Sequence, residues 1–192
     1  MHPRTHLLTL FAITLIVVGA LVAVLITLLG QPDTTVSLTQ QFRSQTGINF
    51  DYPEDWRSVI PERNIIFLAD PTVMNQQPGA SMTIQRSLRL TTEVDTLEAA
   101  LERYVQRGPL AAAGEWTLTG EIRATQIDGR DARSLSLEGS ELADAVPMRS
   151  EISVTTADNG IFYIFAMSAP LSDWPAVAPT FAAILDSVQI QE

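Results

Sequence analysis

The feature that most constrains this chain is an uncharged apolar run of 23 residues, 7–29, near its N-terminus. At about 1.5 Å per helical residue, about 20 such residues cross the hydrocarbon core of a bilayer. The run is also longer than the apolar centre of a cleavable signal peptide, which has about 7–15 residues. We therefore predict an uncleaved signal anchor, a transmembrane helix that contacts the lipid bilayer through residues 7–29.

The charges beside this run predict its orientation. Arg4 precedes the run, whereas the first charge after it is Asp33 and the first base is Arg43. Basic residues stay on the cytoplasmic side of a membrane helix. We therefore expect a short cytoplasmic N-terminus, residues 1–6, in a single-pass protein of the cell membrane. Gly19 and Ala23 have the small-xxx-small spacing of helix dimers, which suggests a weak homodimer.

The chain after the anchor divides into two parts. Residues 30–46 are polar, rich in Thr and Gln and without period, and we interpret them as a stalk. Residues 47–192 have the length of one domain, enough to bury a core without disulfides. We expect this domain to be extracytoplasmic.

The charge of the part after the anchor restricts its partners. It carries 22 carboxylates against 11 arginines, a net charge of −11. Nucleic acids and anionic lipid headgroups bind basic patches, so neither is expected as a partner.

The residue types that are missing restrict the chemistry. The only histidines are His2 and His6, and the chain has no Cys and no Lys. After the anchor this excludes Ser-His-Asp and Cys-His catalysis, Schiff bases and zinc sites with N or S ligands. We therefore predict no enzyme, and no catalytic, cofactor-binding or metal-binding residues.

Carboxylates leave two alternatives open. A glycan-acting enzyme needs two of them about 5 to 9.5 Å apart, and the loop 138–144 has oxygen ligands for a Ca²⁺ or small-ligand sensor. The candidate groups are Glu54 with Asp55, Asp128 with Asp131, and Glu138 with Glu141 and Asp144. All lie in or beside predicted turns, where such residues bond neighbouring amides. Solvated turns are the simpler interpretation.

Alternation of apolar and polar residues predicts a sheet from residue 47 onward. Asp128-Gly129 and Asn159-Gly160 are signals for hairpins. In 161–167 both faces are apolar, which is typical of a central strand covered on both sides. Arg86 interrupts the apolar face of its strand. The predicted strands are 48–52, a return strand from Trp56 after the turn Pro53–Asp55, 64–70, 81–90, 116–127, 131–139, 146–156 and 160–168.

Two segments switch to helical period. The first is 95–107, with Asp95 as N-cap, Glu98 as its capping-box partner and a stop at Gly108-Pro109. The second lies within 172–188, with Ser172 as cap and Pro179 either at its first position or after a distorted turn. The predicted class is α+β: an antiparallel β-sheet with helices on both faces, an α/β/α sandwich, preceded by the transmembrane helix.

The three tryptophans are candidates for a partner surface. Trp56 follows a turn, Trp116 opens a strand and Trp174 starts a helix. Aromatic side chains often anchor partners, but Trp is also highly buried on average, and packing at the edge of the core is the simpler interpretation.

Residues 46–190 resemble the PsbP-like and DcrB-like domain family, with its Mog/PsbP-type fold. The similar stretches are Ile48–Trp56 (INFDYPEDW), the capped central helix, Ile127–Ala132 (IDGRDA) and Phe181–Val188. The resemblance implies an α/β/α sandwich. Its members include extrinsic photosystem subunits, a nuclear-import factor and bacterial envelope proteins, which act mostly as binding or assembly modules. No cofactor pattern of the family carries over, and a photosystem role does not follow from the fold.

From these observations we expect a non-enzymatic, membrane-anchored, extracytoplasmic module that binds or assembles other envelope proteins. The glycan-acting enzyme and the Ca²⁺ or small-ligand sensor are the alternatives.

Overall fold

The computed structural model describes residues 36–44, 47–87, 96–141 and 146–191. The predicted anchor, 7–29, with Gly19 and Ala23, lies outside these residues. Among the described helices, none is long and apolar enough to cross a membrane.

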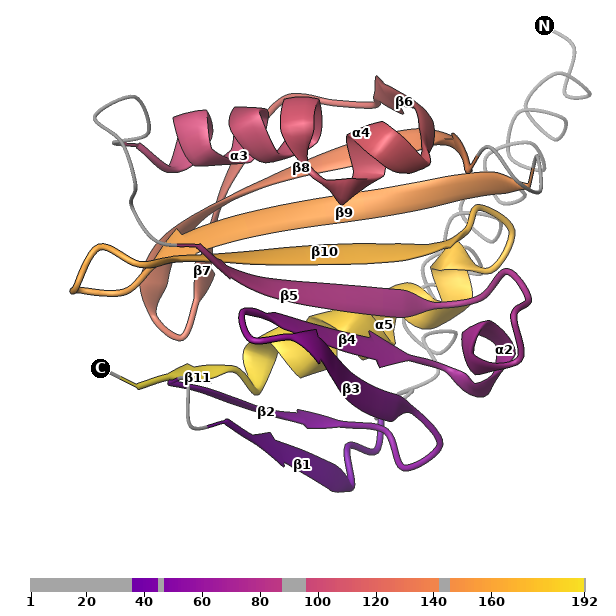
Figure 1. The fold of residues 1–192 in the computed structure, drawn as a ribbon, viewed down its shortest axis with the longest axis horizontal. Coiled ribbons are helices and arrows are strands. Elements are labelled where there is room, and N and C mark those ends of the chain that lie inside the picture. Colours follow the sequence, from indigo (N-terminus) through magenta and orange to yellow (C-terminus); the bar gives the residue numbers. More distant parts are fainter. Residues whose placement is uncertain (1–35, 45–46, 88–95, 142–145, 192) are drawn as a thin grey trace, which may run out of the picture. The chain divides into compact units, whose positions relative to one another are not determined.

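A large antiparallel sheet forms the centre of the domain (Figure 1). It has eight strands in the order β3-β4-β5-β10-β9-β8-β6, and β7 also pairs with β8. The strands are β3 (Arg57–Glu62), β4 (Ile65–Ala69), β5 (Ser81–Ser87), β6 (Gly114–Leu118), β7 (Arg123–Ile127), β8 (Arg130–Glu141), β9 (Pro147–Thr156) and β10 (Phe162–Pro170).

A second sheet joins the two ends of the described chain. It consists of β1 (Gln40–Arg43), β2 (Ile48–Tyr52) and β11 (Gln189–Ile190) in the order β1-β2-β11. We expected residues 40–43 in the polar stalk, but they pair with β2, and the ring of Phe42 stacks on Phe50 with centroids 4.9 Å apart. A strand of four residues with one apolar side chain is too short to show a period.

The first long helix, α3 (Leu97–Arg107), begins one residue later than predicted. Thr96 is its N-cap, and the Thr96 hydroxyl accepts from the Ala99 amide at 3.1 Å. Asp95 lies outside the described residues. Glu98 pairs with Arg133 of β8, and hydrogen bonds from its own backbone and from Arg133 lower the pKa of Glu98.

The three other helices differ from the prediction. Gly108 ends α3 as expected, but Pro109 begins a short helix, α4 (Pro109–Ala113). The C-terminal helix, α5 (Trp174–Asp186), has Asp173 rather than Ser172 at its N-cap, and Pro179 lies inside it. A short helix, α2 (Pro71–Met74), replaces part of a predicted loop because the Asp70 carboxylate caps it.

Strand β10 is buried along its whole length and separates two cores. Tyr163, Phe165 and Met167 belong to one core, which we call the first core, together with α5 and β2. Phe162 and Ile164 belong to the other, together with α3. Because alternate side chains of a strand point to opposite faces, α3 and α5 cover opposite faces of the large sheet. The predicted antiparallel sheet with helices on both faces is confirmed for the described domain, and Figure 1 shows α5 passing behind β4 and β5.

The two sequences predicted to form hairpins, Asp128-Gly129 and Asn159-Gly160, adopt different turns. Asp128 and Gly129 both have positive φ, 53° and 69°, as a type I′ turn requires. At the other turn only Gly160 has positive φ, 78°, and the loop is wider, closed by a bond from the Ala157 amide to the Ile161 carbonyl. The predicted strand 116–127 is in fact two strands, β6 and β7, that both pair with β8.

Candidate functional site

The structure does not bring the three tryptophans to one surface. Trp56 is 5% exposed, and its ring meets the edge of Phe181 with centroids 5.8 Å apart. Trp174 lies 5.6 Å from the same Phe181 ring, under the guanidinium of Arg149. Trp116 packs against the other core. All three are therefore packing side chains, and Trp56 is not accessible to a partner.

The candidate carboxylates that the structure describes lie on turns or beside arginines. Glu54 and Asp55 are exposed on the turn before Trp56. The Asp128 carboxylate accepts from the Ile190 amide at 2.8 Å, and Glu138 lies 3.7 Å from Arg149. Asp144 and the Glu141 side chain lie outside the described part of the chain. Among the described residues, no group of three acids or histidines has the arrangement of a metal site.

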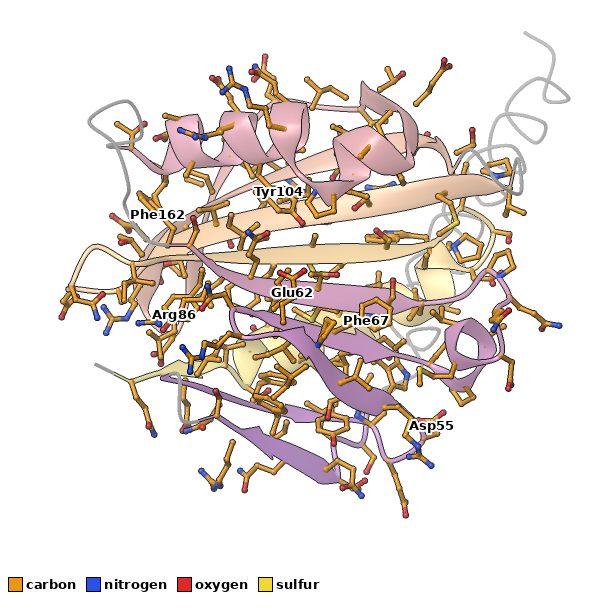
Figure 2. The ribbon with its side chains drawn as sticks, viewed as in Figure 1. Asp55, Glu62, Phe67, Arg86, Tyr104 and Phe162 are labelled. Carbon is orange, nitrogen blue, oxygen red and sulfur yellow. The ribbon has the colours of Figure 1, made fainter. Side chains whose placement is uncertain are left out.

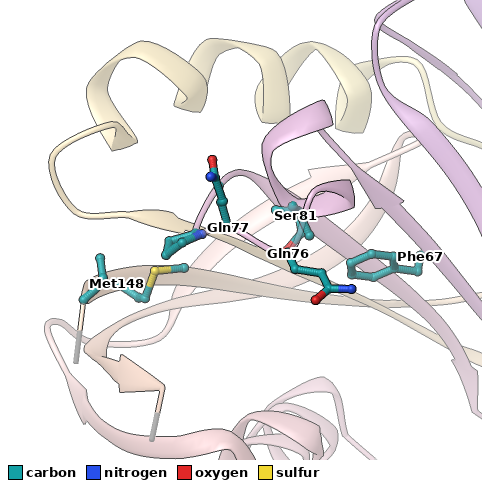
Figure 3. Close-up of a pocket in the computed structure, with 9 residues that line it drawn as sticks. Phe67, Gln76, Gln77, Ser81 and Met148 are labelled. Carbon is teal, nitrogen blue, oxygen red and sulfur yellow. The ribbon is translucent and has the colours of Figure 1, made fainter. Parts of the chain in front are cut away.

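One surface hollow, of about 280 Å³, is lined by the loop after α2. Figure 3 shows Phe67, Gln76 and Met148 around it. Asp70 holds this loop, because its two carboxylate oxygens accept from the Val73 and Ala80 amides at 2.9 Å. The lining has no charged side chain, so the hollow offers only neutral groups to a ligand.

A second hollow, of about 450 Å³, is shallow and polar. It lies between the turn at Asp128 and the end of α5, and Asp51 and Asp186 also line it. Asp128 is already occupied by the Ile190 amide.

A third hollow contains two arginines, and we call it the Arg cleft. It has a volume of about 30 Å³. Its polar lining residues are Ser44, Arg63, Asn64, Arg86 and Tyr163, and no carboxylate is among them.

The strands that surround the Arg cleft fix its geometry. Arg86 of β5 lies opposite Tyr163 of β10, and its backbone amide donates to the carbonyl of Asn64, in the turn between β3 and β4, at 2.9 Å. Arg86 follows Met82 and Ile84 on the same face of β5, which faces the first core. Figure 2 shows Arg86 at the left end of β5.

The floor of the Arg cleft is apolar. Ile48 and Ile84 are 1% exposed and line it together with Ile66. Against this floor the Nε atom of Arg86 is buried and has no hydrogen-bond partner among the described residues. At the mouth, Ile60 of β3 is 59% exposed.

Other arginines of the domain have carboxylate partners. Arg123 pairs with Glu151 at 3.0 Å, Arg149 lies near Glu138, and Arg130 and Arg133 pair with Asp158 and Glu98. Within the described part of the chain, neither Arg63 nor Arg86 has a carboxylate within ion-pair distance. The Arg cleft is therefore a positive site on an acidic domain.

Sequence reasoning did not predict this site. Arg86 was noticeable because it interrupts the apolar face of β5. Arg63 gave no signal, since it follows Glu62 in a polar stretch and reaches the cleft only through the pairing of β3 with β4.

The described domain has a PsbP/Mog1-type fold, as the sequence resemblance predicted. This class is defined by an antiparallel sheet with helices on both faces, and solved structures of three proteins match it with TM-scores above 0.5.

The cyanobacterial PsbP (CyanoP) of Synechocystis is similar with a TM-score of 0.59 and 18% identity, over 83% of this chain and 96% of that one. The Ran-binding protein Mog1p of Saccharomyces cerevisiae is similar with a TM-score of 0.54 and 10% identity, over 80% and 96%. LpqN of Mycobacterium tuberculosis, involved in cell envelope biogenesis, is similar with a TM-score of 0.51 and 15% identity, over 80% and 91%.

No family model matches the sequence, and no curated protein matches it. At these identities the similarity is one of fold.

Proposed function

We propose that this chain is a membrane-anchored, extracytoplasmic module that binds and stabilises other envelope proteins and has no enzymatic activity. Two proteins with this fold, Mog1p and LpqN, are described as Ran-binding and as involved in cell envelope biogenesis. The absence of His, Cys and Lys after the anchor supports a binding role over catalysis.

The observation that carries the proposal is the apolar edge of the large sheet. β3 is the terminal strand in the pairing order, and Val59 and Ile60 on it are 40% and 59% exposed. A terminal strand offers backbone N–H and C=O groups to a further strand, and exposed apolar side chains add contact area. We name Val59, Ile60 and Pro61 the β3 edge and place the protein partner there.

Site-specific photo-cross-linking tests this proposal. A photoreactive phenylalanine at position 60, in the native membrane, is expected to capture an envelope protein that mass spectrometry identifies. The matched control is position 118, because Leu118 is 56% exposed on β6, at the opposite end of the sheet. Capture at both positions equally, or at neither, would contradict the role of the β3 edge.

The membrane position is part of the proposal and rests on the sequence. The run 7–29 anchors the chain, and residues 33–192 lie outside the cytoplasm. Extraction with carbonate should leave the chain in the membrane. Protease added to intact spheroplasts, without detergent, should digest the domain. A domain that the protease does not digest would show the opposite orientation.

The proposed homodimer is tested by cross-linking the chain to itself. Cross-linking that is lost when Gly19 and Ala23 are changed to Leu would identify the homodimer.

A further inference from the structure

We infer that the Arg cleft is a binding site for a carboxylate group. This site shares Ile60 with the β3 edge, but it binds through side chains and not by strand addition, and it requires no protein partner. The inference depends on the donors in the cleft, its size and shape, and its charge.

The buried donor is the first argument. The Nε–H of Arg86 is removed from solvent and has no acceptor among the described residues. A buried donor of a charged group that lacks an acceptor is costly. The Nε atoms of Arg130 and Arg149 are also buried without an acceptor, but those two side chains have carboxylates near their Nη1 atoms, and Arg86 has none among the described residues. Arg86 also lines the cleft, so a turn of its guanidinium toward an oxygen held there would give this donor an acceptor. Nε and one Nη of a guanidinium form a planar fork that matches the two oxygens of a carboxylate.

Size and shape are the second argument. The cleft has a volume of about 30 Å³, which is room for about two water molecules, because a cavity needs about 10–15 Å³ by the same measure to hold one. The two oxygens of a carboxylate lie in one plane, so the group needs no room above or below that plane. A phosphate or sulfate is tetrahedral and projects oxygens out of the plane of the fork, so it requires a wider space.

Charge is the third argument. Two arginines, Arg63 and Arg86, line the cleft, and no carboxylate is among its lining residues. Its floor of buried isoleucines, Ile48, Ile66 and Ile84, keeps the local dielectric constant low, and this strengthens the attraction for an anion. Arg63 is exposed at the rim, so it can approach an anion that Arg86 holds.

The carboxylate has two possible sources, a free small molecule or an acidic side chain of a polypeptide. Both present the same group to Arg86. A polypeptide would also contact Ile60 at the mouth of the cleft, whereas a small acid would not. The two sources therefore differ in affinity and in their dependence on Ile60.

The test is an NMR titration of the full chain in micelles of an uncharged detergent. The arginine Nε–Hε signals are followed at pH 7 while sodium acetate replaces sodium chloride at constant ionic strength. We expect the Arg86 signal to shift and to saturate. Inorganic phosphate is titrated in parallel and is expected to bind more weakly.

Variants separate the cleft from general charge effects. Arg86→Lys keeps the charge but removes the planar fork, and acetate binding should weaken by about tenfold or more, the factor that about 1.4 kcal/mol produces. Arg63→Gln, at an exposed position that folding tolerates, should weaken it as well. Arg107→Lys, at an exposed arginine in the last turn of α3, is the matched control and should leave acetate binding unchanged.

Two short peptides distinguish the sources. Acetyl-Leu-Glu-Leu-amide is compared with its Gln counterpart and with acetate. Tighter binding of the Glu peptide than of acetate, lost in Ile60→Ser, identifies a polypeptide source, and equal binding identifies a small acid. The inference is overturned if no arginine signal saturates, if Arg107→Lys weakens binding as much as Arg86→Lys, or if phosphate binds more tightly. These results do not depend on the photo-cross-linking, so the cleft and the proposed function can fail separately.

Discussion

Phe181 of α5 lies between two tryptophans, and this contact makes Trp56 a central residue of the first core. Trp56 is 5% exposed and meets Phe181 edge to face. Replacing a buried Trp by Ala removes its contacts and leaves a cavity. Trp56→Ala should lower the free energy of unfolding by ~3–5 kcal/mol, measured by urea denaturation.

The neighbouring acids supply the control for this prediction. Glu54→Gln with Asp55→Asn changes only exposed turn residues, so the double variant should unfold close to the native midpoint. If Trp56→Ala is tolerated, or if the double variant unfolds, the stability of the domain depends on the turn acids and not on the Trp56 ring.

Position 139 of β8 has no room for a side chain, so it requires glycine. A Cβ built there would lie 2.1 Å from the Glu115 carbonyl oxygen of the paired strand β6. Gly139→Ala should therefore separate β6 from β8 and reduce stability by ~1–3 kcal/mol, as overpacking does. Gly120→Ala is the control, because nothing lies within 4 Å of a Cβ there. Equal unfolding midpoints for the two variants would refute the steric explanation.

Tyr104 of α3 gives the domain a dependence on alkaline pH. Burial raises the pKa of Tyr104 from 10.0 to about 12. The neutral phenol is therefore favoured in the folded state, so its stabilising effect is complete below pH 10 and is lost as pH rises from 10 to 12.

Comparison with Tyr104→Phe isolates this effect. At pH 11 the native chain should have lost ~1 kcal/mol relative to pH 9 through this group alone, whereas the Phe variant should lack that component. The measurement is the difference between urea midpoints at the two pH values. The same loss in both chains would assign the pH dependence to other groups.

At the scale of elements, the turn between β7 and β8 positions the last strand. Asp128 has φ of 53°, and its carboxylate accepts from the amide of Ile190 in β11. Asp128→Ala should cost ~1–3 kcal/mol through the lost hydrogen bond and the strained backbone. Asp128→Asn keeps an oxygen acceptor and tolerates positive φ, so it should cost less. Faster hydrogen exchange at Ile190 in the Ala variant alone would identify the bond as the cause.

Sequence patterns predicted the elements that have a repeated period. β2 and β5 alternate, and α3 has its apolar stripe and its stop where they were expected, although its N-cap is Thr96. β4 was predicted from its short apolar run instead. The short elements were not predictable in this way. β1 depends on one ring, Phe42 on Phe50, and β11 on the bonds of Ile190 and Gln191 to distant residues. The contacts of β11 join residues more than 60 positions apart and leave no local signal, whereas β1 is too short to show a period.

The same limit applies to the Arg cleft. Arg86 is noticeable in the sequence as a charged residue on an apolar face, but the cleft forms only because β3 pairs with β4 and β4 with β5, which places Arg63 in the same lining. The tryptophans show the opposite case. They are prominent in the sequence, yet Trp56 and Trp174 pack on Phe181 and form part of the core.

At the scale of the whole molecule, residues 36–192 form one compact unit. Expressed without residues 1–35, this unit should fold and unfold in one cooperative step, because one sheet connects both of its cores. Far-ultraviolet circular dichroism and tryptophan fluorescence should give coincident urea transitions. Two separate transitions would show that the α3 side and the α5 side fold as independent units.

Strand β10 also bears on how such a chain can change over time. Its odd-numbered side chains contact one core and its even-numbered side chains the other, with the backbone between them. Substitutions in separate clusters have nearly additive effects on stability. Each core can therefore accumulate replacements without compensating changes in the other. The sequences of the two cores can then diverge independently while the order of the strands is kept. This chain is only 10 to 18% identical to the three solved proteins with the same fold, which is consistent with that freedom.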